Sequence, residues 1–265
     1  MSTSIPVVLI HGLWIHSNSW QGWMDLYRQA GYDPIAPGWP GDSGSVDETR
    51  QNSEAVGDQG LDDITASYID VIEGLDAKPI VIGHSFGGVV AQKLLADGYA
   101  AACIVIDPAQ IKGVKAVPLS QIRSGFPVLS KPSNKHKAVV LSQHQFRYAF
   151  GNAIPESESD ELFNRWAIPG PGKPLFEAST ANFKKTSPAA VDTKTDSRGP
   201  LLIIGGGSDH TAPESIAKAT RKLYGDSNAT TDFQSFPDRG HSLVFDHGWR
   251  EIADYTLAWL KRQGL

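Results

Sequence analysis

The 265-residue sequence contains a single cysteine, Cys103, and therefore cannot form a disulfide within the chain. Cys103 lies in an apolar run, where we expect a small core residue; a thiol nucleophile is the alternative. The chain also lacks a surplus of positive charge, because its formal net charge is -5. This argues against a general basic field for nucleic acid or an anionic membrane, and we expect the one basic cluster, Lys131, Lys135 and Lys137, to be a solvated loop.

Long apolar runs are missing as well, since no stretch approaches the roughly 20 residues of a membrane span. The opening residues Met-Ser-Thr-Ser-Ile-Pro carry no charge of the kind that begins a secretory signal peptide. We therefore expect a cytoplasmic protein with no membrane or nucleic-acid partner. No group of His, Cys, Asp and Glu has metal-site spacing, and the glycines at 205–207 lack the pattern of a phosphate-binding loop, so we expect neither a metal nor another cofactor.

The sequence does contain an alternation of short apolar runs and helical patterns. Runs of strand length occur at residues 5–10, 33–36, 79–82, 102–106, 201–204 and 231–236. Apolar residues at helical spacing lie at 20–30, 61–75, 86–97, 213–224 and 249–262. The alternation predicts an α/β fold, with a mostly parallel sheet of about six strands covered by helices on both faces.

Residues 110–199 interrupt this alternation. They contain helix-like pieces at 142–150, 157–168 and 175–183, and no convincing strand. We expect a helical cap insertion on a core made of residues 1–109 and 200–265.

Aromatic residues are concentrated in this insertion. We expect Phe146 and Trp166 to face a substrate pocket together with Trp14. A covered apolar pocket favours compact, largely apolar substrates over charged ones, whose desolvation it does not compensate.

The sequence Gly-His-Ser-Phe-Gly at residues 83–87 joins a predicted strand to a predicted helix. On such a tight turn the serine backbone is strained, and only small neighbours such as Gly83 and Gly87 leave room for it. The hydroxyl of Ser85 then projects above the sheet, and the positive end of the following helix points at it. We therefore interpret Ser85 as a nucleophile; a purely structural turn is the alternative.

A serine nucleophile needs a base, and the base needs an orienting carboxylate. In parallel sheets, ligands bind beyond the carboxyl ends of the strands. Asp209 follows the predicted strand at 201–204, and His241 follows the one at 231–236. We interpret them as the acid and the base. Asp107 also ends a strand and is the alternative acid.

The chain order Ser85, Asp209, His241 resembles that of the α/β-hydrolase superfamily, and the resemblance covers the chain from about residue 5 onward. It implies a reduced sheet that lacks the family's two leading strands, because the chain enters its first strand at once. It also implies a hydrolase of the carboxylesterase or lactonase type, acting on a small-molecule ester or lactone.

The segment His11-Gly12-Leu13-Trp14 is similar to the family's His-Gly-x motif. By that resemblance, the backbone N–H groups of Leu13 and Phe86 form the oxyanion hole. His16 stands one position later than the corresponding histidine of related esterases and hydroxynitrile lyases, so no role is assigned to it.

Other activities share this arrangement of residues. A perhydrolase or a carbon–carbon bond hydrolase could use the same three side chains, and a small-molecule receptor is the alternative from another class. A hydroxynitrile lyase is disfavoured, because those relatives have a lysine where this chain has Ser242.

Overall fold

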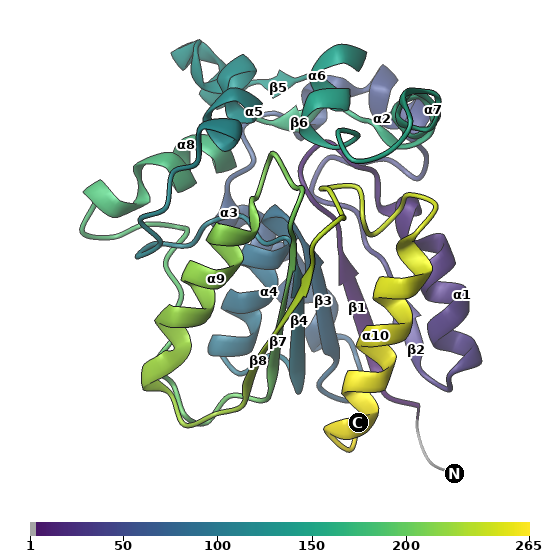
Figure 1. Cartoon of the computed structure of the whole chain (residues 1–265), viewed down its shortest axis with the longest axis vertical. Helices are drawn as coiled ribbons and strands as arrows, with labels where there is room; N and C mark the ends of the chain where they lie inside the picture. Colours follow the sequence, from purple (N-terminus) through teal and green to yellow (C-terminus); the bar gives the residue numbers. More distant parts are fainter. Residues whose placement is uncertain (1–3) are drawn as a thin grey trace.

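The structure, a computed structural model, describes residues 4–265. A six-stranded sheet lies at its centre, in the order β2-β1-β3-β4-β7-β8 (Figure 1). The strands are β1 (Pro6–Ile10), β2 (Asp33–Ile35), β3 (Ile80–His84), β4 (Ala102–Ile106), β7 (Leu201–Gly206) and β8 (Thr231–Phe236). All neighbouring pairs are parallel, so the prediction of a mostly parallel sheet is confirmed. The carboxyl ends of the strands therefore meet at one edge.

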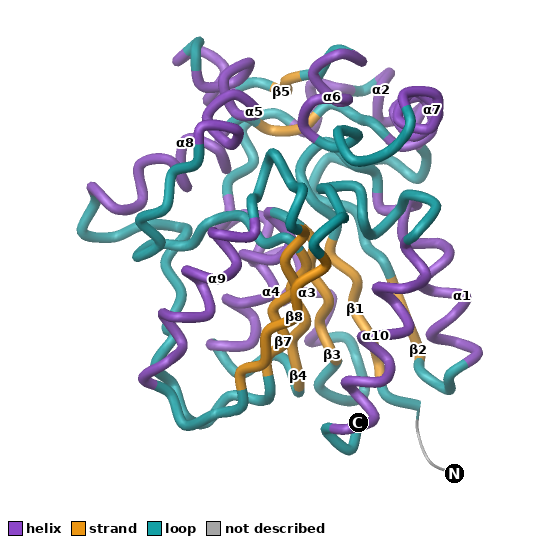
Figure 2. The backbone as a smooth tube through the Cα atoms, viewed as in Figure 1, coloured by secondary structure: helices purple, strands orange, loops and turns teal. Residues whose placement is uncertain are grey.

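Helices cover both faces of the sheet, as predicted (Figures 1 and 2). One face carries α1 (Gln21–Gln29) and α10 (Trp249–Arg262), and the other carries α3 (Leu61–Glu73), α4 (Phe86–Ala96) and α9 (Glu214–Leu223). The strands β1, β3 and β4 are buried along their whole length because helices pack on both sides of them. Among residues 4–265, no helix is both long enough and apolar enough to cross a bilayer.

Cys103 lies in β4 and is fully buried, as expected for a small core residue. Burial raises the pKa of its thiol above the ordinary value. A thiol that stays protonated inside the core is a poor nucleophile, which disfavours the alternative reading of Cys103.

Between β4 and β7 the chain forms a group of elements beyond the carboxyl ends of the strands (Figure 1). They are α5 (Leu119–Leu129), η3 (Pro132–His136), β5 (Ala138–Val139), α6 (Gln143–Ala149), α7 (Glu156–Trp166), β6 (Gly170–Pro171), α8 (Lys173–Thr180) and η4 (Ala181–Phe183). The shorter α2 (Val46–Gln51) lies in the same region of Figure 1. Three more 3-10 turns complete the elements: η1 (Ser17–Trp20), η2 (Ser53–Val56) and η5 (Tyr224–Asp226).

This region differs from the sequence prediction in three elements, one helix and two short strands. Helix α5 was not expected, because it contains Gly125 and Pro127, which disfavour a helix interior. The strands β5 and β6 form a short antiparallel pair, whereas no strand was expected here. Each has two residues, too few to produce an alternating pattern.

Candidate active site

Ser85 occupies the turn between β3 and α4, where its backbone has φ 55° and ψ -122°. A left-handed φ is strained for a residue with a Cβ atom. The close packing of the turn requires its glycines: a Cβ at Gly83 would lie 2.2 Å from the carbonyl oxygen of Gly87, and a Cβ at Gly87 would lie 2.4 Å from that of Ile10. This backbone places the Ser85 hydroxyl at the carboxyl edge of the sheet.

The structure brings Ser85, His241 and Asp209 together. Nε2 of His241 lies 3.0 Å from Oγ of Ser85, and Nδ1 of His241 lies 2.6 Å from Oδ2 of Asp209. The carboxylate accepts the proton on Nδ1, which leaves Nε2 free to accept the proton of the serine hydroxyl. All three side chains are almost fully buried, so solvent does not compete for these hydrogen bonds.

The other oxygen of Asp209, Oδ1, accepts backbone N–H groups from Thr211 at 2.6 Å and from Ala212 at 2.9 Å. Burial is the largest single effect and opposes ionisation of this carboxyl group, but the proximity of His241 and the hydrogen bonds to the carboxylate together outweigh it and lower the pKa of Asp209. Asp209 is therefore held in one orientation as a carboxylate.

Asp107 lies beside this pair. Its Oδ1 accepts the N–H of Gly206 at 2.5 Å, and its Oδ2 is buried with no donor among the described residues. Burial, and then the neighbouring charge of Asp209, raise the pKa of Asp107 well above its usual range. A carboxyl group that holds its proton at this position can donate it towards the neighbouring Asp209, whereas Asp107 makes no hydrogen bond to His241 among the described residues.

Asp107, Asp209 and His241 form the one group of at least three possible metal-ligating side chains found within residues 4–265, with ligand atoms within 4.8 Å of one another. The 2.6 Å contact between His241 and Asp209 is a hydrogen-bond distance. Two ligands about 2.0 Å from a shared zinc ion would lie farther apart than this. The geometry therefore fits proton sharing better than metal binding.

Sequence reasoning missed the residues that hold His241 in place. His84 packs against it with ring centroids 4.6 Å apart, and Nε2 of His84 donates to the His241 carbonyl at 2.9 Å. Burial, and then the proximity of His241, hold the pKa of His84 well below its usual range, so His84 is a neutral support. Ser242, the residue after His241, donates a hydrogen bond through its hydroxyl group to the buried carboxylate of Asp246. Asp246 also forms an ion pair with Arg239. A serine in this bonded position could not be recognised as structural from sequence.

The N–H groups of Leu13 and Phe86 are both available at this edge of the sheet. Among the backbone hydrogen bonds of the described residues, neither group donates to a carbonyl, and Phe86, as the first residue of α4, has no intrahelical acceptor. Gly12 allows the loop after β1 to approach, because a Cβ there would lie 2.8 Å from Cβ of Ser85. The N-terminus of α4 adds a positive partial charge next to Ser85.

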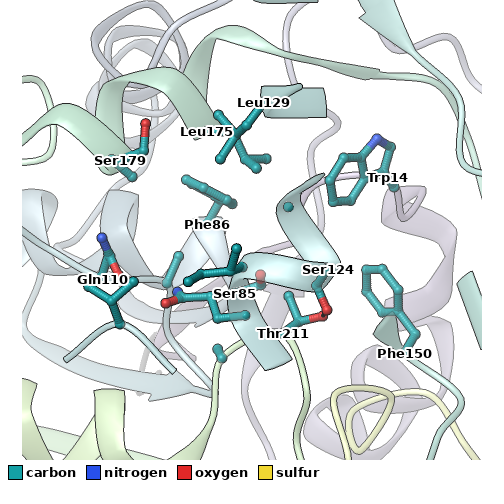
Figure 3. A pocket seen from close by; sticks show the side chains of 17 residues that line it. Trp14, Ser85, Phe86, Gln110, Ser124, Leu129, Phe150, Leu175, Ser179 and Thr211 are labelled. Carbon is teal, nitrogen blue, oxygen red and sulfur yellow. Dashed lines mark hydrogen bonds between the residues drawn. The ribbon is translucent and has the colours of Figure 1, made fainter. Parts of the chain in front are cut away.

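Ser85 opens into an apolar cavity of about 150 Å³ (Figure 3). Trp14 and Phe86 line it from the core, and its other walls come largely from α5 and α8. The remaining lining residues are Ala109, Gln110, Val117, Gln121, Ile122, Ser124, Gly125, Leu129, Phe150, Leu175, Ala178, Ser179, Thr211 and Ala212. The indole nitrogen of Trp14 donates to the carbonyl of Val139, 3.1 Å away, which fixes the ring at the cavity wall.

Two of the three residues expected to line this pocket do not line it. Phe146 is fully buried and packs against Phe150 and Phe163, with ring centroids 4.9 Å and 5.5 Å apart. Trp166 lies under the guanidinium group of Arg165 at 4.5 Å. Phe150, one helical turn after Phe146, lines the cavity instead.

His16 is a structural residue. Its Nδ1 accepts the N–H of Asn18 at the start of η1, and its Nε2 donates to the carbonyl of Ser43 at 3.0 Å. Burial lowers its pKa, so it remains neutral while it connects these two loops. Neither ring nitrogen bonds to Ser85.

Comparisons with known proteins agree with this architecture. No significant match was found among curated protein sequences. Solved structures of similar fold include a putative non-heme bromoperoxidase from Mycobacterium tuberculosis H37Rv, with 18% identity, a TM-score of 0.70 and coverage of 98% of this chain and 93% of that one. A monoacylglycerol lipase from Paleococcus ferrophilus has 19% identity, a TM-score of 0.67 and coverage of 97% and 94%. A methylesterase from Arabidopsis has 15% identity, a TM-score of 0.65 and coverage of 97% and 99%.

The sequence profile of the alpha/beta hydrolase family matches residues 7–255, which is nearly the whole chain. The match includes every strand of the sheet except the first residue of β1, and it includes the turn that carries Ser85. The chain therefore belongs to the α/β-hydrolase family.

Proposed function

We propose that this protein is a serine hydrolase that cleaves a small to medium, largely apolar carboxylic ester or lactone through an acyl-enzyme. The observation that carries the proposal is the hydrogen-bonded series from Ser85 through His241 to Asp209, at the end of an apolar cavity. Two neighbours of similar fold, the methylesterase and the monoacylglycerol lipase, are named for carboxylic esters, which supports the reaction class.

In the first half of the reaction, Nε2 of His241 accepts the hydroxyl proton while Oγ of Ser85 attacks the substrate carbonyl carbon. The negative charge that develops on the carbonyl oxygen is stabilised by the N–H groups of Leu13 and Phe86, where removal of one such donor typically costs about 3–4 kcal/mol. Asp209 stabilises the imidazolium form of His241. This histidine then donates its proton to the departing alcohol oxygen.

In the second half, water enters where the alcohol has left. His241 accepts a proton from the water, whose oxygen attacks the acyl carbon of the ester on Ser85. Collapse of the second tetrahedral intermediate returns the proton to Oγ and releases the acid. For a lactone, acid and alcohol are parts of one product. No step requires a metal or cofactor.

The cavity supports the choice of substrate. Its volume of about 150 Å³ is similar to that of a protein cavity that binds benzene, about 150 Å³. One short acyl chain or one aromatic ring fills such a space. In this proposal residues 110–199 act as a cap that defines the acyl site, while residues 1–109 and 200–265 supply the reacting groups.

The test is hydrolysis of p-nitrophenyl esters of increasing acyl length by the purified protein. We expect turnover that is highest for short acyl chains, together with labelling of Ser85 by a fluorophosphonate. Ser85→Ala should lower kcat by about 10⁶ and abolish the labelling, as removal of a triad nucleophile does. Undiminished ester hydrolysis by Ser85→Ala would falsify the assignment.

A further inference from the structure

The exposed apolar side chains of this protein are confined to one region. Within residues 4–265, every exposed large hydrophobic residue lies between residues 117 and 183, and none lies on the helices that cover the sheet. Four of them are close in sequence: Val117, Leu119, Ile122 and Phe126, with exposed fractions of 60%, 84%, 48% and 63%. We call these four residues the apolar lip.

Three of the four lip residues form one face of α5, and Val117 lies just before the helix begins. Leu119, Ile122 and Phe126 recur at intervals of three and four residues, so they project from the same side of the helix. The opposite side, with Ser124 and Val128, is buried against the protein. Single exposed apolar residues are common on proteins, whereas a continuous apolar helix face without a partner marks an interaction site.

The lip lies at the entrance of the cavity that contains Ser85. Val117 and Ile122 are both exposed and line that cavity, so the apolar surface continues from the outside of α5 inward. The exposed ring of Phe183 belongs to a neighbouring segment, because Asn182 bonds through its side chain to Gly113 and Val114, each at 2.7 Å.

The part of the sequence that contains the lip is basic, although the chain as a whole has a net charge of -5. Between Asp107 and Glu156 the sequence contains no Asp or Glu. The Lys and Arg residues of this stretch are Lys112, Lys115, Arg123, Lys131, Lys135, Lys137 and Arg147. In the described part of the chain, only Arg147 of this set forms an ion pair. Lys112 bonds to the carbonyls of Lys184 and Lys185, and Arg123 stacks on Tyr148. Lys115 and Lys131, just before and just after α5, are exposed and can meet an anionic surface.

We propose that the apolar lip, with the lysines beside it, docks onto the surface of an anionic lipid bilayer. Helix α5 then lies in the plane of the interface, with Leu119, Ile122 and Phe126 among the upper parts of the acyl chains. Lysines such as Lys115 and Lys131 lie at the level of the anionic headgroups. The charge pattern selects this partner, because an apolar face rimmed by unpaired lysines complements a surface that is apolar inside and negative outside. This departs from the expectation, based on total charge, that no membrane is involved.

Docking in this way would also affect how substrate reaches the active site. Only this part of the proposal rests on the proposed hydrolase function. The entrance at Val117 and Ile122 faces the lipid, so an apolar ester dissolved in the bilayer can reach Ser85 without crossing water. The binding itself does not depend on catalysis.

The experiment is cosedimentation of the full-length Ser85→Ala protein with vesicles, which separates binding from turnover. We expect binding to vesicles of phosphatidylcholine mixed with phosphatidylglycerol, and binding at least about ten-fold weaker to phosphatidylcholine alone or at high salt. The double variant Leu119→Ser/Phe126→Ser should bind the mixed vesicles about ten-fold more weakly or worse, because it removes apolar contact with the acyl chains. Both side chains are largely exposed, so the fold should remain intact, which circular dichroism checks.

A matched pair of charge variants tests the lysines. Lys115→Glu/Lys131→Glu should weaken binding, whereas Lys78→Glu/Lys261→Glu changes total charge equally on exposed positions outside the α5 region and should bind like the parent. Absence of binding by the parent, or equal binding by the lip variant, overturns the proposal. So does a dimer that Leu119→Ser/Phe126→Ser dissociates, because a second copy then covers the lip. Failure of ester hydrolysis with intact vesicle binding refutes the proposed function alone.

Discussion

The carboxyl group of Asp107 lies against that of Asp209, and ligand atoms of both lie within 4.8 Å of His241. Only Asp209 bonds to the imidazole, while Asp107 accepts the N–H of Gly206 and is kept neutral by burial and by the charge of Asp209. The two acids therefore differ: Asp209 bonds to His241 and its pKa is lowered, whereas the pKa of Asp107 is raised by burial and by Asp209, which favours a protonated Asp107 that can donate towards Asp209.

This difference predicts opposite responses to amide substitution. Asp209→Asn should lower kcat by about 10⁴, because an amide presents a donor to Nδ1 and favours the wrong imidazole tautomer. Asp107→Asn should retain kcat within about ten-fold, since the amide can still donate to Asp209 and accept from Gly206. Asp107→Ala serves as the comparison, because it removes the donor and should raise the pKa of Asp209, which shifts the acid limb of the kcat/KM profile. A larger loss for Asp107→Asn than for Asp209→Asn would move the acid to Asp107.

Neutral Asp107 should also affect stability in a pH-dependent manner. Its pKa is raised in the folded state, so stability from this group is fully present below the unfolded pKa of about 3.9 and is lost as pH rises towards the folded pKa. Asp107→Asn does not titrate. The difference in free energy of unfolding between Asp107→Asn and wild type, measured by urea denaturation, should therefore increase in favour of the variant between roughly pH 4 and pH 7. A constant difference over that interval would show that Asp107 ionises normally.

The sequence was sufficient to predict the parts that depend on local patterns. The sheet and its covering helices follow from apolar periodicity. The turn at Ser85 follows from glycines at positions where a residue with a Cβ atom does not fit. The choice between Asp107 and Asp209 was open, because both follow strands and only their distance from His241 separates them.

The lining of the cavity was beyond sequence reasoning for a similar reason. Phe146 and Phe150 lie one helical turn apart and are both apolar, so periodicity places them on the same side of the α6 region. Their different positions depend on how this part of the chain packs against Phe163 and the core. Helix α5, which supplies much of the lining, was hidden by Gly125 and Pro127.

Backbone strain at Ser85 makes a stability prediction. With φ 55° and ψ -122°, a residue with a Cβ is held in a sparsely populated conformation that costs on the order of 1–3 kcal/mol. The free energy of unfolding of Ser85→Gly, measured by denaturant titration, should therefore exceed that of Ser85→Ala by about 1 kcal/mol. This figure includes the greater conformational entropy of glycine in the unfolded chain. Both variants lack the hydroxyl, so the comparison isolates the Cβ. Equal stability of the two variants would mean that the turn relaxes without strain.

Gly12 provides a test of the oxyanion hole. A Cβ at this position meets Cβ of Ser85 at 2.8 Å and Nδ1 of His84 at 3.1 Å, so Gly12→Ala must displace the loop that carries the N–H of Leu13. We expect kcat to fall by about 10²–10³, with a much smaller change in KM, because the oxyanion forms only in the transition state. Gly225→Ala is the matched control, since a Cβ there has no neighbour within 4 Å. If Gly12→Ala raised KM at constant kcat, the loop would serve substrate binding and not the oxyanion.

Gln110 is the polar group of the cavity with an unmet hydrogen-bonding need. Its Oε1 is buried and has no partner among residues 4–265, although the side chain lines the cavity next to Ser85 (Figure 3). A substrate hydroxyl could supply the missing donor, whereas a purely aliphatic acyl group leaves the amide unpaired. We therefore expect Gln110→Leu to shift the ratio of kcat/KM for ethyl lactate over ethyl propionate downward by about ten-fold, equivalent to roughly 1.4 kcal/mol.

The rate of fluorophosphonate labelling of Ser85 should remain unchanged in Gln110→Leu, because the reacting groups are intact. Gln121→Leu is the matched control: it makes the same substitution in the same cavity, at a residue without a buried unpaired atom in the described structure. An equal shift in both variants would indicate a general effect of apolarity. A shift in Gln110→Leu alone would identify Oε1 of Gln110 as the acceptor that selects hydroxylated acyl groups.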